Sequence, residues 1–304
     1  MKRGSQIAAM AMLVALTSAC GGPGSLYGAK KNTTGDAITV AASFYPIAEI
    51  VSRVGGVKVS VVNLTPAGTD AHEVELTAKQ LQELQDAKIT FYLGENYQPS
   101  VQKAISSLKG SSVDLLTVVP TSGFSCGTCE INPHVWLDPA NIILMTRQVE
   151  KSLSASRPEL ATYFSEQASA FVAELTTLGN SIDAAFTQCE STILVTAHDA
   201  FHYFAQRAHL GVYSVAHITP DAQLSAQELE KLIATLQSKK VFTVFSEELI
   251  DSPLVVTVAQ KLGATTDTLN PLEGLTNADI KAGKNYITVQ RDNIARIAKG
   301  LKCS

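Results

Sequence analysis

Short apolar runs alternate with longer amphipathic stretches from residue 38 onward, and the runs are rich in β-branched residues. In the first half of the chain these runs predict strands at Ile38–Ala42, Lys58–Leu64, Ile89–Leu93 and Val113–Leu116. The stretches between them predict helices at Pro46–Val54, Thr77–Asp86 and Pro99–Leu108. Strands that alternate with helices of about ten residues are typical of βα units around a mainly parallel sheet.

The same alternation returns in the second half of the chain. Strands are predicted at Thr192–Thr196, Val212–Val215 and Val241–Phe245. Helices are predicted at Ala200–Ala208, Ala226–Ser238, Pro253–Leu262 and Tyr286–Leu301. The predicted fold class is therefore α/β, with one βα lobe over 38–157 and a second over 189–304, each around a mainly parallel sheet.

The segment between the two lobes, 158–188, carries one long helical stripe. Its apolar members are spaced by three, four or seven residues: Leu160, Phe164, Phe171, Leu175, Leu178, Ile182 and Phe186. A helix of this length would reach roughly 46 Å at about 1.5 Å per residue. We expect a rigid strut that joins the lobes. The alternative is two shorter helices that meet near Gly179, because an interior glycine costs about 1 kcal/mol relative to alanine.

The chain begins with a different pattern. Lys2 and Arg3 precede a short apolar run, and small residues lead to Cys20. This is typical of a lipoprotein-type signal over 1–19, after whose cleavage Cys20 would carry a lipid; plain secretion is the alternative. The apolar run is too short to span a bilayer. Residues 20–37, rich in Gly, Ser, Thr and Lys, predict a flexible tether.

Charge and cysteine content narrow the class of protein. The 304 residues carry a formal net charge of −4 and no basic block, which argues against nucleic-acid binding. Of the 5 cysteines, four remain if Cys20 is acylated, and an exported chain favours disulfides. Three pairings are possible. We favour Cys126–Cys129, whose members are neighbours, with Cys189–Cys303; thiolate metal binding or redox activity is the alternative for the CxxC.

Three of the 6 histidines lie on loops that follow predicted strands: His72, His134 and His198. Ligands of parallel sheets bind at such strand ends, so a site between the lobes is expected. Three imidazoles and one oxygen form a common tetrahedral zinc site. His202 lies four residues after His198 and is either structural or a spare ligand. His209 and His217 have no ligand context.

Three segments around these histidines resemble one known family: GTDAHEVELTAKQL, NPHVWLDPANI and VTAHDAFHYFAQRAHLGV, in that order. They are similar to the ligand segments of the zinc/manganese solute-binding proteins of ABC transporters, the high-affinity zinc-uptake family. The resemblance covers the chain from Ile38 to Cys303. It implies two βα lobes joined by one long helix, with the metal between the lobes.

The resemblance also implies a ligand set and partners. It assigns His72, His134 and His198 as the three nitrogen ligands, and histidine at the third position favours zinc over manganese. It implies that the metal is transported rather than used in catalysis. The expected partners are ABC permease subunits and, through the lipid anchor, a membrane. The expected location is the cell envelope, either on the outer face of the cytoplasmic membrane or in the periplasm. The protein is expected to be a monomer.

The fourth ligand is where the sequence departs from the family. Family members often have Asp in the segment that aligns with TLNPLEGL, whereas this chain has Asn270. The fourth position is therefore open between Asn270, Glu247 and water. Asp138 and Asp199 adjoin ligands and either orient them by hydrogen bonds or cap local turns.

The sequence leaves three other functions open. A receptor for manganese or ferrous iron would use the same fold. A zinc hydrolase would use three histidines with an open water position, although no general base stands out. A lipid-anchored surface adhesin would bind host molecules.

Overall fold

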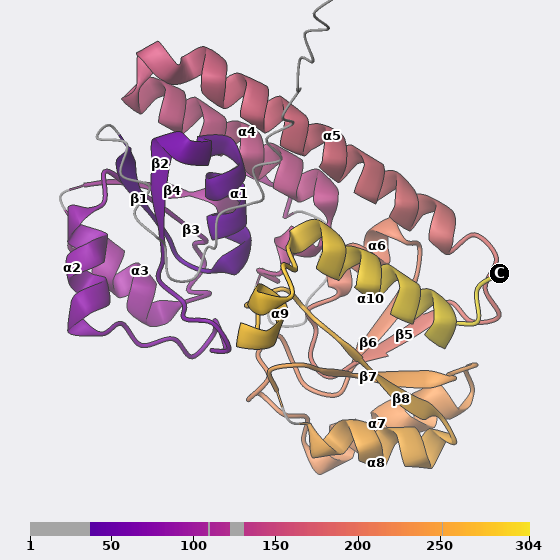
Figure 1. Cartoon of the computed structure of the whole chain (residues 1–304). Helices are drawn as coiled ribbons and strands as arrows, with labels where there is room; N and C mark the ends of the chain where they lie inside the picture. Colours follow the sequence, from indigo (N-terminus) through magenta and orange to yellow (C-terminus); the bar gives the residue numbers. More distant parts are fainter. Residues whose placement is uncertain (1–36, 109, 122–130, 251) are drawn as a thin grey trace, which may run out of the picture.

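The computed structural model describes residues 37–108, 110–121, 131–250 and 252–304. The expected signal, the tether with Cys20, and the CxxC cysteines Cys126 and Cys129 lie outside these residues. The described chain forms two four-stranded parallel sheets, each flanked by helices, so the α/β fold class with two lobes is confirmed (Figure 1). No helix in the described ranges combines the length and the apolar character that crossing a bilayer requires.

The first sheet has the strand order β2-β1-β3-β4. Its strands are β1 (Ile38–Ala42), β2 (Val59–Asn63), β3 (Ile89–Tyr92) and β4 (Ser111–Asp114). Its helices are α1 (Tyr45–Gly55), α2 (Ala78–Asp86) and α3 (Pro99–Ser106). The fourth strand was predicted to end at Leu116, but it ends at Asp114. There the Asp114 side chain accepts a hydrogen bond from the backbone N–H of Leu116, and a 3₁₀ turn begins.

The second sheet repeats this topology with the order β6-β5-β7-β8. Its strands are β5 (Ile193–Thr196), β6 (Gly211–Ser214), β7 (Thr243–Glu247) and β8 (Thr265–Leu269). Its helices are α6 (His202–Arg207), α7 (Ala226–Gln237), α8 (Pro253–Leu262), α9 (Asn277–Lys281) and α10 (Tyr286–Gly300). The strand β8 and the helix α9 were not predicted from the sequence.

Two helices connect the lobes, α4 (Pro139–Ser156) and α5 (Ala161–Ala185), and α5 extends along both halves of the molecule (Figure 1). The helix α5 continues without a break through Gly179, so the alternative of two shorter helices is wrong. Its predicted apolar stripe is buried from Phe164 to Ile182. The helix α4, which was not predicted from the sequence, packs beside α5 and makes the strut two helices wide.

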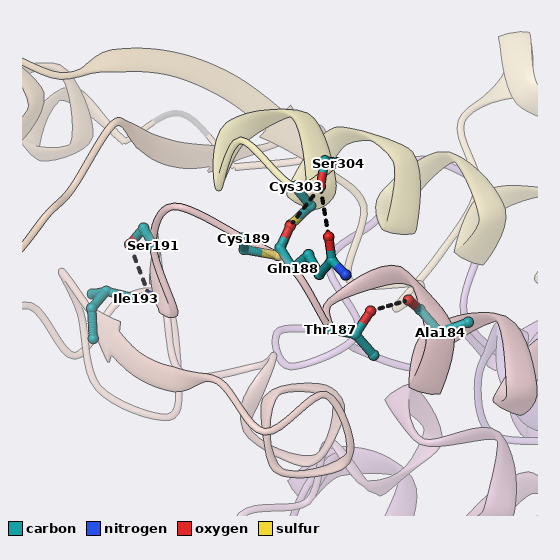
Figure 2. The surroundings of a disulfide bond; sticks show 8 residues. All are labelled: Ala184, Thr187, Gln188, Cys189, Ser191, Ile193, Cys303 and Ser304. Carbon is teal, nitrogen blue, oxygen red and sulfur yellow. Dashed lines mark hydrogen bonds between the residues drawn. A yellow bond between two sulfur atoms is a disulfide. The ribbon is translucent and has the colours of Figure 1, made fainter.

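A disulfide between Cys189 and Cys303 joins the residues after α5 to the C-terminus (Figure 2). Backbone hydrogen bonds reinforce the connection, because Ser304 N–H donates to Gln188 at 2.9 Å and Ser191 N–H donates to Leu301 at 3.2 Å. This pairing agrees with the one favoured from the sequence. The disulfide therefore ties the C-terminal helix α10 to the end of the strut.

Parallel strands bring their carboxyl ends to one edge of each sheet, and the polar residues of interest follow those ends. His72 lies in the loop after β2, His198 follows β5, and Glu247 is the last residue of β7. Glu273 lies in the loop after β8. The fold thus directs loops from both sheets towards one region between the lobes.

Candidate metal centre

Three histidines and one glutamate converge between the lobes: His72, His134, His198 and Glu273. Their potential ligand atoms all lie within 4.8 Å of one another. His134, His198 and Glu273 are 0%, 1% and 2% exposed, and His72 is partly buried. The structure thus brings together the three histidines that the sequence analysis selected and adds a carboxylate that it did not name.

Five of the six distances between these atoms match the spacing of a tetrahedral site. The Nε2 of His134 lies 3.2 Å from the Nε2 of His72 and 3.2 Å from that of His198. Glu273 Oε1 lies 3.3, 3.0 and 3.2 Å from the Nε2 atoms of His72, His134 and His198. A zinc ion about 2.0–2.1 Å from four tetrahedral ligands would hold them ~3.3 Å apart.

His134 is fixed by its neighbour Asn132. The Asn132 Oδ1 accepts a hydrogen bond from the His134 backbone N–H at 3.0 Å and lies 2.8 Å from its Nδ1. An amide oxygen only accepts, so Nδ1 carries the proton of the neutral ring and Nε2 presents a lone pair. Burial lowers the pKa of His134 to about 4, which keeps the ring neutral.

His198 is fixed by Glu247. The strands β5 and β7 are neighbours, and a carboxylate oxygen of Glu247 lies 2.7 Å from His198 Nδ1. The carboxylate accepts the Nδ1 proton, so His198 Nε2 also points at Glu273. Burial alone lowers the pKa of His198, but the carboxylates of Glu247 and Glu273 outweigh it and hold that pKa well above its ordinary value.

His72 is placed by the loop after β2. The Asp70 Oδ1 accepts a hydrogen bond from the His72 backbone N–H at 2.8 Å, which closes a tight turn. Gln98 donates through Nε2 to the Ala71 carbonyl at 3.1 Å and ties this loop to the segment before α3. The ring of Tyr97 meets the His72 ring edge-on at 4.7 Å. His72 is thus held among the converging side chains by contacts within the first lobe.

Glu273 is placed by a turn that Asn270 shapes. The Asn270 Oδ1 accepts a hydrogen bond from the Leu272 backbone N–H at 2.7 Å, and Leu272 adopts a positive φ of 61°. Burial raises the pKa of the Glu273 carboxyl, but the imidazoles of His72, His134 and His198 outweigh it and hold that pKa well below its usual range. Glu273 is therefore an anion in a buried site.

A cation at the centre of the cluster would relieve the repulsion between its acceptor atoms. In their neutral forms, His134 and His198 both direct Nε2 lone pairs at Glu273 Oε1, which is itself an acceptor. Lone pairs at 3.0–3.2 Å repel each other unless a proton or a metal ion lies between them. Four convergent donors with a single negative charge are a ligand set for a divalent cation.

The structure gives the other two candidates for the fourth position different roles. Asn270 uses its Oδ1 in the turn, and its Nδ2 donates to Glu248 at 2.9 Å. Glu247 lies behind His198, on its Nδ1 side, rather than among the converging Nε2 atoms. Among the described residues it is therefore Glu273, rather than Asn270 or Glu247, whose carboxylate lies among the three Nε2 atoms.

The two aspartates that were expected near the ligands also form local contacts. Asp138 caps α4 by accepting from the backbone N–H of Ala140 at 2.9 Å. Asp199 accepts hydrogen bonds from Asn132 Nδ2 through its backbone carbonyl at 2.7 Å and through its carboxylate at 3.3 Å. Asp199 therefore links the His198 segment to the residue that orients His134.

The remaining histidines lie outside the described cluster. His202 begins α6, with Nδ1 3.7 Å from the Asp199 carboxylate. His209 is exposed and adopts a positive φ of 55° just after α6. His217 is exposed, and its backbone pairs with Ala222 and Asp199.

Comparisons with known proteins place the chain in a family. It matches the family described as "Zinc-uptake complex component A periplasmic" over residues 40–300. The chain therefore belongs to this family of solute-binding receptors, as the resemblance had implied.

Individual relatives and one solved structure show the same family resemblance. The zinc-binding lipoprotein AdcA of Streptococcus pneumoniae is 32% identical over 273 residues, which cover 84% of this chain and 54% of that protein. The high-affinity zinc uptake system protein ZnuA of Bacillus subtilis is 26% identical over 99% of this chain and 98% of its own length. The crystal structure of Zn(II)-bound AdcA from S. pneumoniae superposes with a TM-score of 0.75 at 31% identity, covering 87% of this chain and 58% of that one. The chain spans about half the length of the AdcA relatives that it matches.

Proposed function

We propose that this protein is an extracytoplasmic receptor that captures Zn²⁺ and delivers it to an ABC importer. The observation that carries the proposal is the convergence of His72, His134, His198 and Glu273, in which five of the six donor–donor pairs lie 3.0–3.3 Å apart and all lie within 4.8 Å. Family membership and the zinc-binding names of the relatives support the same conclusion.

The donor set favours zinc over harder ions. Three neutral imidazoles and one carboxylate suit a borderline ion that accepts four tetrahedral ligands. Magnesium and calcium prefer oxygen ligands and six or more positions. The carboxylate of Glu273 halves the charge of the bound dication, and Glu247 beside His198 neutralises the remainder. A neutral buried complex avoids the large cost of an uncompensated charge.

The geometry supports capture of the ion rather than catalysis with it. Catalytic zinc sites keep one position open for water, whereas Glu273 here closes the fourth position. Asn132 and Glu247 each fix the far nitrogen of a histidine, so the ligands are oriented before the ion arrives.

The cellular setting belongs to the same proposal. A lipid on Cys20 and the tether over 20–37 would hold the receptor in the cell envelope, close to the permease subunits that accept the ion. The relative AdcA of S. pneumoniae is named a lipoprotein, which supports the anchor. The receptor would work as a monomer, because all four ligands come from one chain.

Zinc titration followed by the emission of Trp136 tests this function. Trp136 is the chain's single tryptophan and is fully buried. Its ring lies 5.0 Å from that of His134, and its Nε1 donates at 2.7 Å to the carbonyl of Pro271, two residues before Glu273. We expect the emission to change until one equivalent of zinc has been added. With a competing chelator present, the midpoint of the change gives the zinc affinity. Zinc binding with unchanged Trp136 emission would place the ion elsewhere.

Zinc affinity should fall as the pH is lowered from about 7 to about 5. Although burial opposes it, Glu247 and Glu273 hold the pKa of His198 above its ordinary value, so this ring is protonated in the metal-free protein. Zinc binds only the neutral ring and must displace that proton, and added acid therefore favours the metal-free form. His134, with a pKa of about 4, stays neutral in this window. We expect about one decade of affinity per pH unit; chelator competition at several pH values measures it, and a flat profile would contradict a site built on His198.

A further inference from the structure

Arg207, the last residue of α6, connects three parts of the molecule. Its Nη1 donates to Asp138 Oδ1 at 3.2 Å, at the start of α4. Its Nη2 donates to Asp183 at 2.8 Å, and its Nε donates to the Gly179 carbonyl at 3.3 Å, both on α5. The helix α6 lies beside the C-terminal part of α5, so the guanidinium bridges the two strut helices (Figure 1).

Gly179 is the feature of α5 that admits this side chain. A Cβ atom at residue 179 would lie 2.7 Å from the Nη2 of Arg207, closer than real Cβ atoms approach other groups, and 3.0 Å from its Cζ, which is a tight contact. A glycine in the middle of a long helix is intrinsically unfavourable. Its presence here has a specific physical reason, because the guanidinium lies directly against the helix backbone.

Both partners of this contact are close in sequence to metal-centre histidines. Asp138 follows His134 by four residues, through the short 3₁₀ turn Val135–Leu137. Arg207 belongs to α6, which begins four residues after His198. The ion pair therefore connects the segment of one ligand to the segment of another and fixes both to the strut.

We propose that Arg207 is a positioning residue of the metal centre, which sets the relative placement of His134 and His198 by binding Asp138 and α5 together. The inference rests on the proposed function. Other hydrogen bonds hold the same segment, because Tyr286 donates to the Trp136 carbonyl at 2.7 Å and Gln290 donates to the Leu137 carbonyl at 3.1 Å. The loss of Arg207 should therefore weaken zinc binding about tenfold rather than abolish it, as for other outer partners of metal ligands.

Arg53 offers a matched control. The side chains of Arg207 and Arg53 are 21% and 19% exposed, and each pairs with an acidic residue of α5, Asp183 or Glu174. Arg53 lies in the last turn of α1, and it contacts Glu174 and Phe171 on α5. We expect Arg207→Ala to weaken zinc binding about tenfold. Arg53→Ala should leave the zinc affinity unchanged, even if both variants lower the melting temperature of the metal-free protein.

Gly179→Ala and Asp138→Asn separate positioning from general stability. Gly179→Ala favours the helix yet displaces the guanidinium, so it should weaken zinc binding while keeping Arg207. Asparagine at 138 still caps α4 but loses the charge that Arg207 binds. If the two residues act through each other, the double variant Arg207→Ala/Asp138→Asn should bind zinc no more weakly than Arg207→Ala alone.

For each variant, chelator competition measures the zinc affinity and thermal unfolding without metal measures the melting temperature. The variant His134→Ala is measured in the same way. If His134→Ala binds zinc as tightly as the wild-type protein, the proposed function fails and this inference fails with it. If His134→Ala loses binding but Arg207→Ala matches Arg53→Ala in affinity, only the inference is overturned. Independent, multiplying losses for Arg207→Ala and Asp138→Asn would overturn it as well.

Discussion

His134→Ala is expected to weaken zinc binding by more than about 100-fold, because loss of even an outer partner of a ligand costs roughly 10–100-fold. The substitution removes a neutral imidazole that is fully buried and held by Asn132 at both its backbone N–H and its Nδ1. A water molecule that replaces the ring would be a weaker donor with no fixed orientation. Competition against a zinc chelator of known affinity measures the loss.

His209→Asn is the appropriate control for that variant. His209 is exposed, and its backbone has a positive φ of 55°, a conformation that asparagine adopts more readily than alanine. The control therefore removes an imidazole without adding backbone strain. Equal zinc affinities for His134→Ala and His209→Asn would refute the assignment of the metal centre.

The alternation of apolar runs and amphipathic stretches was enough to predict the α/β class and two lobes, because burial on both faces of a parallel sheet leaves a clear pattern. The strand β8, with the sequence TTDTL, lies at the edge of its sheet and is half-exposed, so it lacks that pattern. The helix α4 has a readable stripe at Ile142, Met145, Val149 and Leu153, all buried, but the sequence analysis did not use it.

The three histidines could be predicted because distinctive residues surround them and because strand ends direct loops to one place. The carboxylate that joins them in the cluster could not be predicted in the same way. The segment TLNPLEGL offers both Asn270 and Glu273, and the direction of each side chain depends on the turn between them. Asn270 closes that turn on the backbone N–H of Leu272, whose positive φ the sequence does not indicate. The only available signal was chemical, since Glu273 is a carboxylate and Asn270 is not.

Gly179 illustrates a different limit. An interior glycine lowers the intrinsic stability of a helix, so the sequence left a break near this residue open. The structure shows an uninterrupted α5 because tertiary contacts override the local preference, with Arg207 lying where a side chain at 179 would be. Local propensity cannot reveal a requirement that comes from a residue on another helix.

Glu273→Gln is expected to weaken zinc binding by more than about 100-fold, a larger loss than the roughly 10–100-fold typical of outer partners. Glutamine keeps the length of the side chain and an oxygen within reach of the three Nε2 atoms. The substitution removes the negative charge that partly neutralises the bound dication, in a buried site where Glu273 is 2% exposed. An amide oxygen is a neutral, weaker donor to zinc, so the loss reports the ligand charge rather than the packing. Chelator competition at neutral pH measures it.

Two further variants decide which residue supplies the oxygen. Glu247→Gln still offers His198 Nδ1 an acceptor, so it should weaken zinc binding only about tenfold, as an outer partner does. Asn270→Asp should give no gain, because its Nδ2 donates to Glu248 and a carboxylate there would face another carboxylate. If Glu273→Gln bound zinc normally while Glu247→Gln lost it, the oxygen ligand would be Glu247. A clear gain for Asn270→Asp would instead place residue 270 at the ion.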